Sequence, residues 1–168
     1  MIKLIGSIML ILSGTIAGCM ASRRLSMRVD FLNQYIKFIS FCETQMRFSA
    51  IPIIEILKRQ ECVQGISPFI KSCIKNMENG LPFSKAWEES LSKINKDTGL
   101  LVEDINLIKD FGLNLGESDV EGQLSHCELN IKLMNEILDS ANENKQKKGR
   151  IYIMLGVFSG IAIALLMC

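Results

Sequence analysis

The chain has 168 residues, of which 48% are hydrophobic and 22% are charged. Its 19 Lys and Arg residues are balanced by 18 Asp and Glu residues, which gives a formal net charge of +1. This balance lacks the basic excess that marks a nucleic-acid-binding protein. The apolar residues are unevenly distributed, because residues 4–22 and 151–168 contain no charged side chain. Each stretch is close to the ~20 residues that a helix needs to cross a membrane.

The two apolar stretches predict a transmembrane helix at residues 1–22, a helical domain at residues 23–150 and a second transmembrane helix at residues 151–168. Basic side chains directly follow the first stretch and directly precede the second, whereas Lys3 is the only one beyond them. Basic residues that flank a span are retained in the cytoplasm. We therefore expect a multi-pass protein of the cell membrane whose central domain is cytoplasmic.

A lipoprotein is the alternative. Ile16, Ala17, Gly18 and Cys19 resemble a lipobox, in which the precursor is cleaved before the cysteine and the cysteine is lipidated. The arginines that follow would disfavour export, and a lipid anchor would be redundant beside a second span. If Cys19 is lipidated, the helical domain lies outside the cytoplasm and binds a ligand or partner there.

Each apolar stretch also carries two glycines four residues apart, Gly14 with Gly18 and Gly156 with Gly160. This spacing lets helix backbones approach closely in lipid. Small residues are common in membrane helices, so a chance occurrence explains the spacing equally well.

Residues 23–150 are predicted to be all-α, an antiparallel bundle of about six helices between the two transmembrane helices. Apolar residues recur at helical intervals of three and four, and no strand pattern competes. Pro52 opens the second helix, Ser67 caps the third ahead of Pro68, and Gly80 ends it. The apolar positions fall at residues 25–46, 53–57, 69–77, 86–94, 101–115 and 120–138.

Residues suited to catalysis or cofactor binding are sparse. His126 is the only histidine, and a metal site needs several ligands. The six cysteines form no C-x-x-C pair, so the sequence indicates neither a zinc site nor a redox dithiol. Cys42, Cys73 and Cys127 fall on apolar helix positions and are interpreted as small hydrophobic residues. With no phosphate-binding loop or G-x-S-x-G motif, we expect a protein that is not an enzyme and has no cofactor.

Residues 111–123 are predicted to join two helices. Gly116 stands where the first helix would stop, because glycine adopts the left-handed conformation without steric cost. Ser118 and Glu121 have the spacing of a capping box for the next helix. An ordinary turn accounts for these features. Gly112, however, costs about 1 kcal/mol relative to Ala inside a helix, so we expect another helix or a partner to approach its backbone.

Three further residues carry predictions. Trp87 lies on an apolar helix face and is expected to be buried. Glu43 occupies an apolar seam position, where it either finds hydrogen-bond donors, with Gln123 and the backbone of the turn as candidates, or marks a seam that ends one turn early. Asp119 sits at the positive end of a helix dipole and could accept hydrogen bonds from a partner.

The same residues resemble a known family. The chain contains the pattern FGxxLGxxDxxxQ, which is formed by Phe111, Gly112, Leu115, Gly116, Asp119 and Gln123. This pattern resembles that of the stage III sporulation protein AB family of endospore-forming bacteria. Glu43 and Trp87 also stand in runs similar to those of the family, and the layout of two terminal spans around a helical domain agrees. The similarity covers essentially the whole chain.

The resemblance implies a non-catalytic platform or adaptor in the membrane complex, a channel, that joins mother cell and forespore. The family is similar to the cytoplasmic domain of type II secretion inner-membrane platform proteins. Implied partners are a secretion-type ATPase of the same operon and the ring-forming channel proteins, and a homo-oligomer remains open. In this interpretation the protein lies in the mother-cell membrane that faces the forespore.

Overall fold

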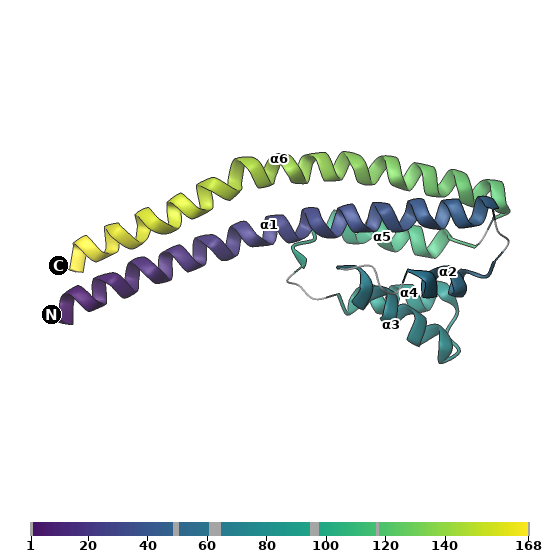
Figure 1. Ribbon diagram of the computed structural model, residues 1–168, viewed down its shortest axis with the longest axis horizontal. Helices are drawn as coiled ribbons and strands as arrows, with labels where there is room; N and C mark the ends of the chain where they lie inside the picture. The colour runs from purple at the N-terminus through teal and green to yellow at the C-terminus, as the bar shows by residue number, and fades with distance from the viewer. Residues whose placement is uncertain (1, 49–50, 61–64, 95–97, 117, 168) are drawn as a thin grey trace. The chain divides into compact units, whose positions relative to one another are not determined.

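The computed structural model describes residues 2–48, 51–60, 65–94, 98–116 and 118–167. These residues form six helices and no strand (Figure 1). The helices are α1 (Ile2–Phe48), α2 (Ile53–Arg59), α3 (Ser67–Glu78), α4 (Phe83–Ser92), α5 (Val102–Asn114) and α6 (Val120–Met167). The predicted all-α class is therefore confirmed.

The chain divides into two compact units. The terminal unit consists of Met1–Val29 and Ser140–Cys168, and the core unit consists of Asp30–Asp139. Helices α1 and α6 contribute residues to both units.

In the terminal unit, α1 and α6 lie side by side and antiparallel (Figure 1). A Cβ atom added to Gly14 would lie 2.5 Å from the Gly156 carbonyl oxygen, and one added to Gly18 would lie 2.5 Å from the Tyr152 carbonyl oxygen. Neither position can therefore hold a larger residue unless a backbone moves. Gly14, Gly18 and Gly156 thus stand where the backbones of α1 and α6 approach each other closely.

Among the described residues, no helix combines the length and the apolar character needed to cross a membrane. The predicted spans at 1–22 and 151–168 fall partly outside this set, which omits Met1, Cys168 and several side chains near both ends.

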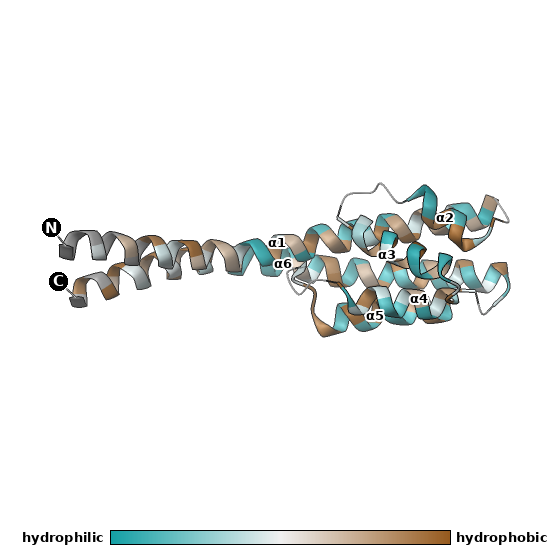
Figure 2. Cartoon of the chain, turned by 90° about the horizontal axis from the view of Figure 1, so that it is seen from below, coloured by the Kyte–Doolittle hydropathy of each residue, from teal (hydrophilic) through white to brown (hydrophobic). Residues whose placement is uncertain are grey.

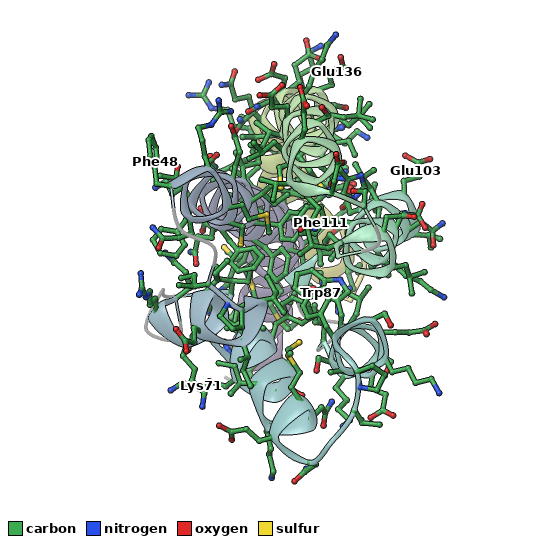
Figure 3. All side chains as sticks on the ribbon, turned by 90° about the vertical axis from the view of Figure 1, so that its right-hand side faces the viewer. Phe48, Lys71, Trp87, Glu103, Phe111 and Glu136 are labelled. Carbon is green, nitrogen blue, oxygen red and sulfur yellow. The ribbon has the colours of Figure 1, made fainter. Side chains whose placement is uncertain are left out.

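The core unit is built around aromatic side chains. Trp87 of α4 is fully buried, which confirms the prediction, and its ring centroid lies 4.6 Å from that of Phe69 in α3 and 5.9 Å from that of Phe38 in α1. The ring centroid of Phe111 in α5 lies 5.9 Å from that of Trp87. Figure 3 shows Trp87 and Phe111 pointing into the unit between the helices. Four helices are thus held together through one indole ring.

The predicted boundaries of α3 are right at one end and wrong at the other. Gly80 follows the helix with φ +90°, as expected of a glycine stop. Ile66, however, is the N-cap, and Ser67 is already the first helical residue. Ile66 is fully buried, and its backbone N–H donates to the Gln34 side-chain oxygen at 3.2 Å. Ile66, which is anchored in the core, therefore takes the N-cap position, and the helix begins at the serine itself.

Candidate functional site

The first contact of the candidate site joins Gly112 of α5 to Trp87 of α4. A Cβ atom on Gly112 would collide with the five-membered part of the Trp87 indole. The indole N–H donates to the Ile108 carbonyl oxygen at 2.8 Å, one turn before the glycine. A buried indole N–H needs such a partner. The expected close approach to Gly112 is confirmed, and the neighbour is a side chain of the same chain.

Phe111 connects this contact to α6. Its ring is fully buried and stacks on the His126 ring, with centroids 5.4 Å apart and planes 8° apart. The His126 Nε2 atom also lies 3.4 Å from the Phe111 carbonyl oxygen, which the Nε2–H tautomer can use as an acceptor. The sequence placed His126 next to an apolar seam but gave no sign of this stacking, because α5 and α6 meet there only in the folded unit.

The turn after α5 has the predicted glycine stop. Leu115 is the C-cap, and its N–H donates to the Phe111 carbonyl oxygen at 3.1 Å. Gly116 follows with φ +94°, a conformation that favours glycine. The chain can therefore leave α5 within one residue of its last hydrogen-bonded turn.

The predicted capping box at the start of α6 is wrong, because Asp119 is the cap. Its Oδ1 atom accepts from the Gly122 N–H at 3.0 Å, and its carbonyl oxygen accepts from the Gln123 N–H at 2.9 Å. The Gln123 side-chain amide donates to the Ser118 carbonyl oxygen at 2.8 Å. Since α6 begins at Val120, the serine lies one residue too early to cap it. Asp is as good an N-cap as Ser and adds favourable charge at the helix dipole.

Gly122 is a structural part of this turn that the sequence did not single out. A Cβ atom there would lie 2.8 Å from the Ser118 hydroxyl oxygen. The loop can fold back over the first turn of α6 only because this side chain is absent. A glycine three residues after a capping aspartate was the available signal.

Glu43 does not pair with Gln123, which corrects another prediction. A Glu43 carboxylate oxygen accepts from Arg47 at 2.7 Å, and the same Arg47 nitrogen lies 3.2 Å from Glu128 of α6. Arg47 stands one helical turn beyond Glu43, so a charged donor is already within reach. Gln123 is instead used within its own turn.

A hollow of about 350 Å³ lies beside the turn. Its lining includes Leu115, Gly116 and Gln123 together with apolar residues that precede α2 or belong to α1, α2, α4 and α5. The predicted site residues fall into two sets that differ in their exposure to solvent. Trp87, Phe111 and Gly112 are buried, whereas Gly116 and Asp119 are exposed.

The cysteines with apolar spacing are confirmed as core residues. Cys42, Cys73 and Cys127 are buried. Burial raises the pKa of the Cys73 and Cys127 thiols to about 12 and that of Cys42 well above its usual value. All three thiols are therefore protonated near neutral pH. Within the described residues, no group of three or more His, Cys, Asp and Glu side chains is placed to hold a metal ion.

Comparison with known proteins gives a match along nearly the whole chain. A family model described as stage III sporulation protein AB matches residues 3–168. The chain is also similar to the stage III sporulation protein AB of Bacillus subtilis (strain 168), at 22% identity over 170 residues that cover 99% of each chain. No solved structure matches the chain.

Proposed function

Because the chain belongs to the stage III sporulation protein AB family, we propose that it is a non-catalytic, membrane-anchored adaptor in the complex that joins mother cell and forespore. The observation that carries this proposal is the family match over residues 3–168, which takes in both apolar stretches and the turn at 111–123. Family membership supports a role in sporulation. The membrane anchor is proposed from the side chains of the terminal unit, and the adaptor role from those of the core unit.

Exposed apolar side chains in the terminal unit support the anchor. Met9, Ile16, Phe158 and Leu165 are each more than half exposed, at 67%, 59%, 66% and 74%. Figure 2 shows hydrophobic residues recurring along α1 and α6 toward the chain ends. Large apolar side chains exposed in number on one unit are typical of a site of membrane or protein contact. With basic residues flanking both stretches, the core unit is proposed to face the cytoplasm.

The residues that could carry chemistry are used in packing, which supports a non-catalytic role. The buried thiols are protonated because of their raised pKa values, and a thiol must ionise to act as a nucleophile. His126 is stacked on Phe111. These groups hold helices together and are not gathered at an open site.

The turn at 111–123 is the proposed contact surface for partners. Its buried half fixes α4, α5 and α6 to one another through Trp87 and Phe111. Its exposed half presents Gly116, which lines the hollow, and Asp119, which caps α6. A rigid base under an exposed turn suits a docking surface, because little order is lost on binding. The secretion-type ATPase and the ring-forming channel proteins remain the proposed partners, on the strength of the family resemblance alone.

The lipoprotein alternative remains a second candidate, since Cys19 is exposed in α1. Cleavage before Cys19 would, however, remove Gly14 and Gly18. Both glycines make close contacts with α6 in the terminal unit. The alternative would therefore require α6 to lose its partner along this length.

Labelling of an introduced cysteine tests the membrane placement. Glu136 is exposed in the core unit and points outward in Figure 3. Glu136→Cys should gain no label over the parent chain from a membrane-impermeant thiol reagent in sealed protoplasts, and should gain label once the membrane is opened. Labelling in sealed protoplasts, with a mass that shows loss of residues 1–18, would establish the lipoprotein instead.

The sporulation role is tested in the same cells. The full chain should restore spore formation to an endospore-forming host that lacks its own copy of the gene. A chain that is present in the membrane at normal level but restores no spores would overturn the proposed role.

A further inference from the structure

A second hollow, of about 380 Å³, lies within the terminal unit between α1 and α6. We call it the neck hollow. Ile153 lines it at the start of the apolar stretch 151–168, and Gly149 contributes backbone. The remaining lining residues all carry hydrogen-bond donors, and they are Ser22, Ser26, Asn142, Lys145, Gln146 and Arg150. No carboxylate is among the described residues that line it.

The surrounding sequence is strongly basic. Residues 22–28 and 140–150 together contain seven Lys and Arg residues and one acidic residue, whereas the whole chain has a net charge of only +1. The acidic residue, Glu143, lies 3.3 Å from Lys147. Lys145 and Arg150, which line the hollow, have no carboxylate partner among the described side chains. Positive charge is therefore concentrated where an anion could be held.

Gly149 brings the two helices together at this place. It is buried, and a Cβ atom on it would lie 3.2 Å from the Ser22 hydroxyl oxygen. The close approach lets polar side chains of both helices reach a single hollow. One end of the lining is cationic and the other, at Ile153, is apolar, so the hollow suits the boundary between a charged group and a hydrocarbon chain.

We propose that the neck hollow binds a phosphate group, supplied either by the headgroup of an anionic phospholipid or by free phosphate. Arg and Lys form strong charge-assisted hydrogen bonds with phosphate oxygens, and hydroxyl and amide donors can complete the coordination. Basic pockets next to membrane helices are suited to lipid headgroups. The lipid source rests on the proposed membrane placement, whereas binding of free phosphate does not.

Native mass spectrometry of the full chain in a neutral detergent tests the site. The chain is titrated with phosphatidylglycerol, with phosphatidylcholine and with inorganic phosphate in separate series. We expect one phosphatidylglycerol per chain to be retained in preference to phosphatidylcholine. Lys145→Gln with Arg150→Gln should weaken this binding by about tenfold or more, because two charge-assisted contacts are lost.

Lys147→Gln with Lys148→Gln is the matched control. It removes the same charge from the same helix but leaves the lining of the hollow unchanged, so its affinity should stay within about threefold of the parent. A charge-keeping pair, Lys145→Arg with Arg150→Lys, should retain binding, which would show that binding requires the positive charge at these two positions and not the particular side chain. Equal loss in the first pair and the control would overturn the proposal. So would the absence of any preference for phosphatidylglycerol together with the absence of inorganic-phosphate binding that depends on Lys145 and Arg150.

The series separate the two sources of phosphate. Retention of phosphatidylglycerol against excess inorganic phosphate supports the lipid, and binding of inorganic phosphate alone that is sensitive to Lys145 and Arg150 supports the free anion. A chain that sediments with membranes but shows neither behaviour loses only this inference. A chain that is not membrane-bound loses the proposed anchor, and the phosphate series still tests the hollow.

Discussion

The two units use glycine in different ways. In the core unit, Gly112 leaves room for an aromatic side chain, the indole of Trp87. In the terminal unit, Gly14 and Gly18 leave room for the backbone of α6. An aromatic contact buries a large apolar area and fixes one orientation. A backbone contact brings two helices together over a narrow strip without a large side chain.

This difference shows that a glycine in a helical pattern predicts a close contact but does not by itself identify the group that makes it. Both kinds cost helix propensity, and both predict that something comes close. The residues around each glycine in the sequence indicate which kind of group comes close to it. Gly112 follows Phe111 in a helix with one apolar face, whereas Gly14 stands in a stretch that is mostly apolar and carries no charge on any side. The first setting favours packing within a globular core and the second favours helix pairing in an apolar environment.

Removal of the Trp87 ring is expected to have the largest effect. Trp87→Ala should lower the free energy of unfolding of the core unit by about 3–5 kcal/mol, because a large fully buried side chain leaves a cavity. The full chain in detergent is unfolded with denaturant and followed by far-UV circular dichroism, since the change removes the only tryptophan. Trp87→Phe, which keeps a ring but loses the bond to Ile108, should lose less. An unchanged midpoint for Trp87→Ala would mean that the ring does not hold the unit together.

Larger residues at the two kinds of glycine sharpen the comparison. Gly112→Ala should destabilise the core unit by roughly 1–3 kcal/mol through overpacking, despite the gain in helix propensity. Combination with Trp87→Phe should give a non-additive result if the ring is the obstacle. Gly14→Ala meets a carbonyl group instead, so no side-chain change at position 87 should alter its effect.

A disulfide crosslink can report on the packing of α1 against α6 in the terminal unit alone. Cysteines placed at Ser22 and Gly149 should crosslink, because the Ser22 hydroxyl oxygen lies 3.2 Å from a Cβ built on Gly149. Gly14→Ala should lower the yield of this crosslink and leave the unfolding midpoint of the core unit unchanged. If Gly112→Ala lowered the yield equally, the two glycines would not act separately.

Changes at Asp119 are expected to have intermediate effects. Asp119→Ala removes the cap of α6 and should cost about 1 kcal/mol. Asp119→Asn keeps a capping oxygen but removes the charge, so stability should change less. If the charge docks a partner, both variants should reduce spore formation with the protein still present in the membrane. Spore counts that follow stability alone would leave Asp119 as a cap only.

The periodic features of the fold could be predicted from the sequence. Six helices, the stop at Gly116 and the burial of Trp87 follow from spacing and from the conformational freedom of glycine. Caps could not be predicted as well. Ile66 caps α3 in place of Ser67, and Asp119 caps α6 in place of Ser118. Ile66 takes this place because it is anchored in the core, and Asp119 because its oxygen accepts from the Gly122 N–H in the folded turn. Local pattern does not contain that information.

The contacts between side chains could not be predicted from the sequence either. The stacking of His126 on Phe111 joins residues from two helices whose faces are set only by the whole core unit. The seam position of Glu43 was clear in the sequence, but its partner was not. Arg47 stands four residues away on the same helix, but the prediction named only Gln123 and the backbone of the turn as candidate donors and left open a seam that ends early.

Glu43 provides the smallest expected effect. Its carboxylate is 20% exposed and bonded to an Arg47 side chain that is 47% exposed, and water and salt screen such a pair. Glu43→Ala should therefore leave the unfolding midpoint close to that of the parent, and added salt should remove what difference remains. Glu43→Ala and Gln123→Ala should be additive, because Gln123 bonds Ser118 and not Glu43. Glu43→Ala and Arg47→Ala should be coupled at low salt. Coupling between Glu43 and Gln123 would instead show that α1 contacts the turn at 111–123. The turn would then be part of the packing in the core unit.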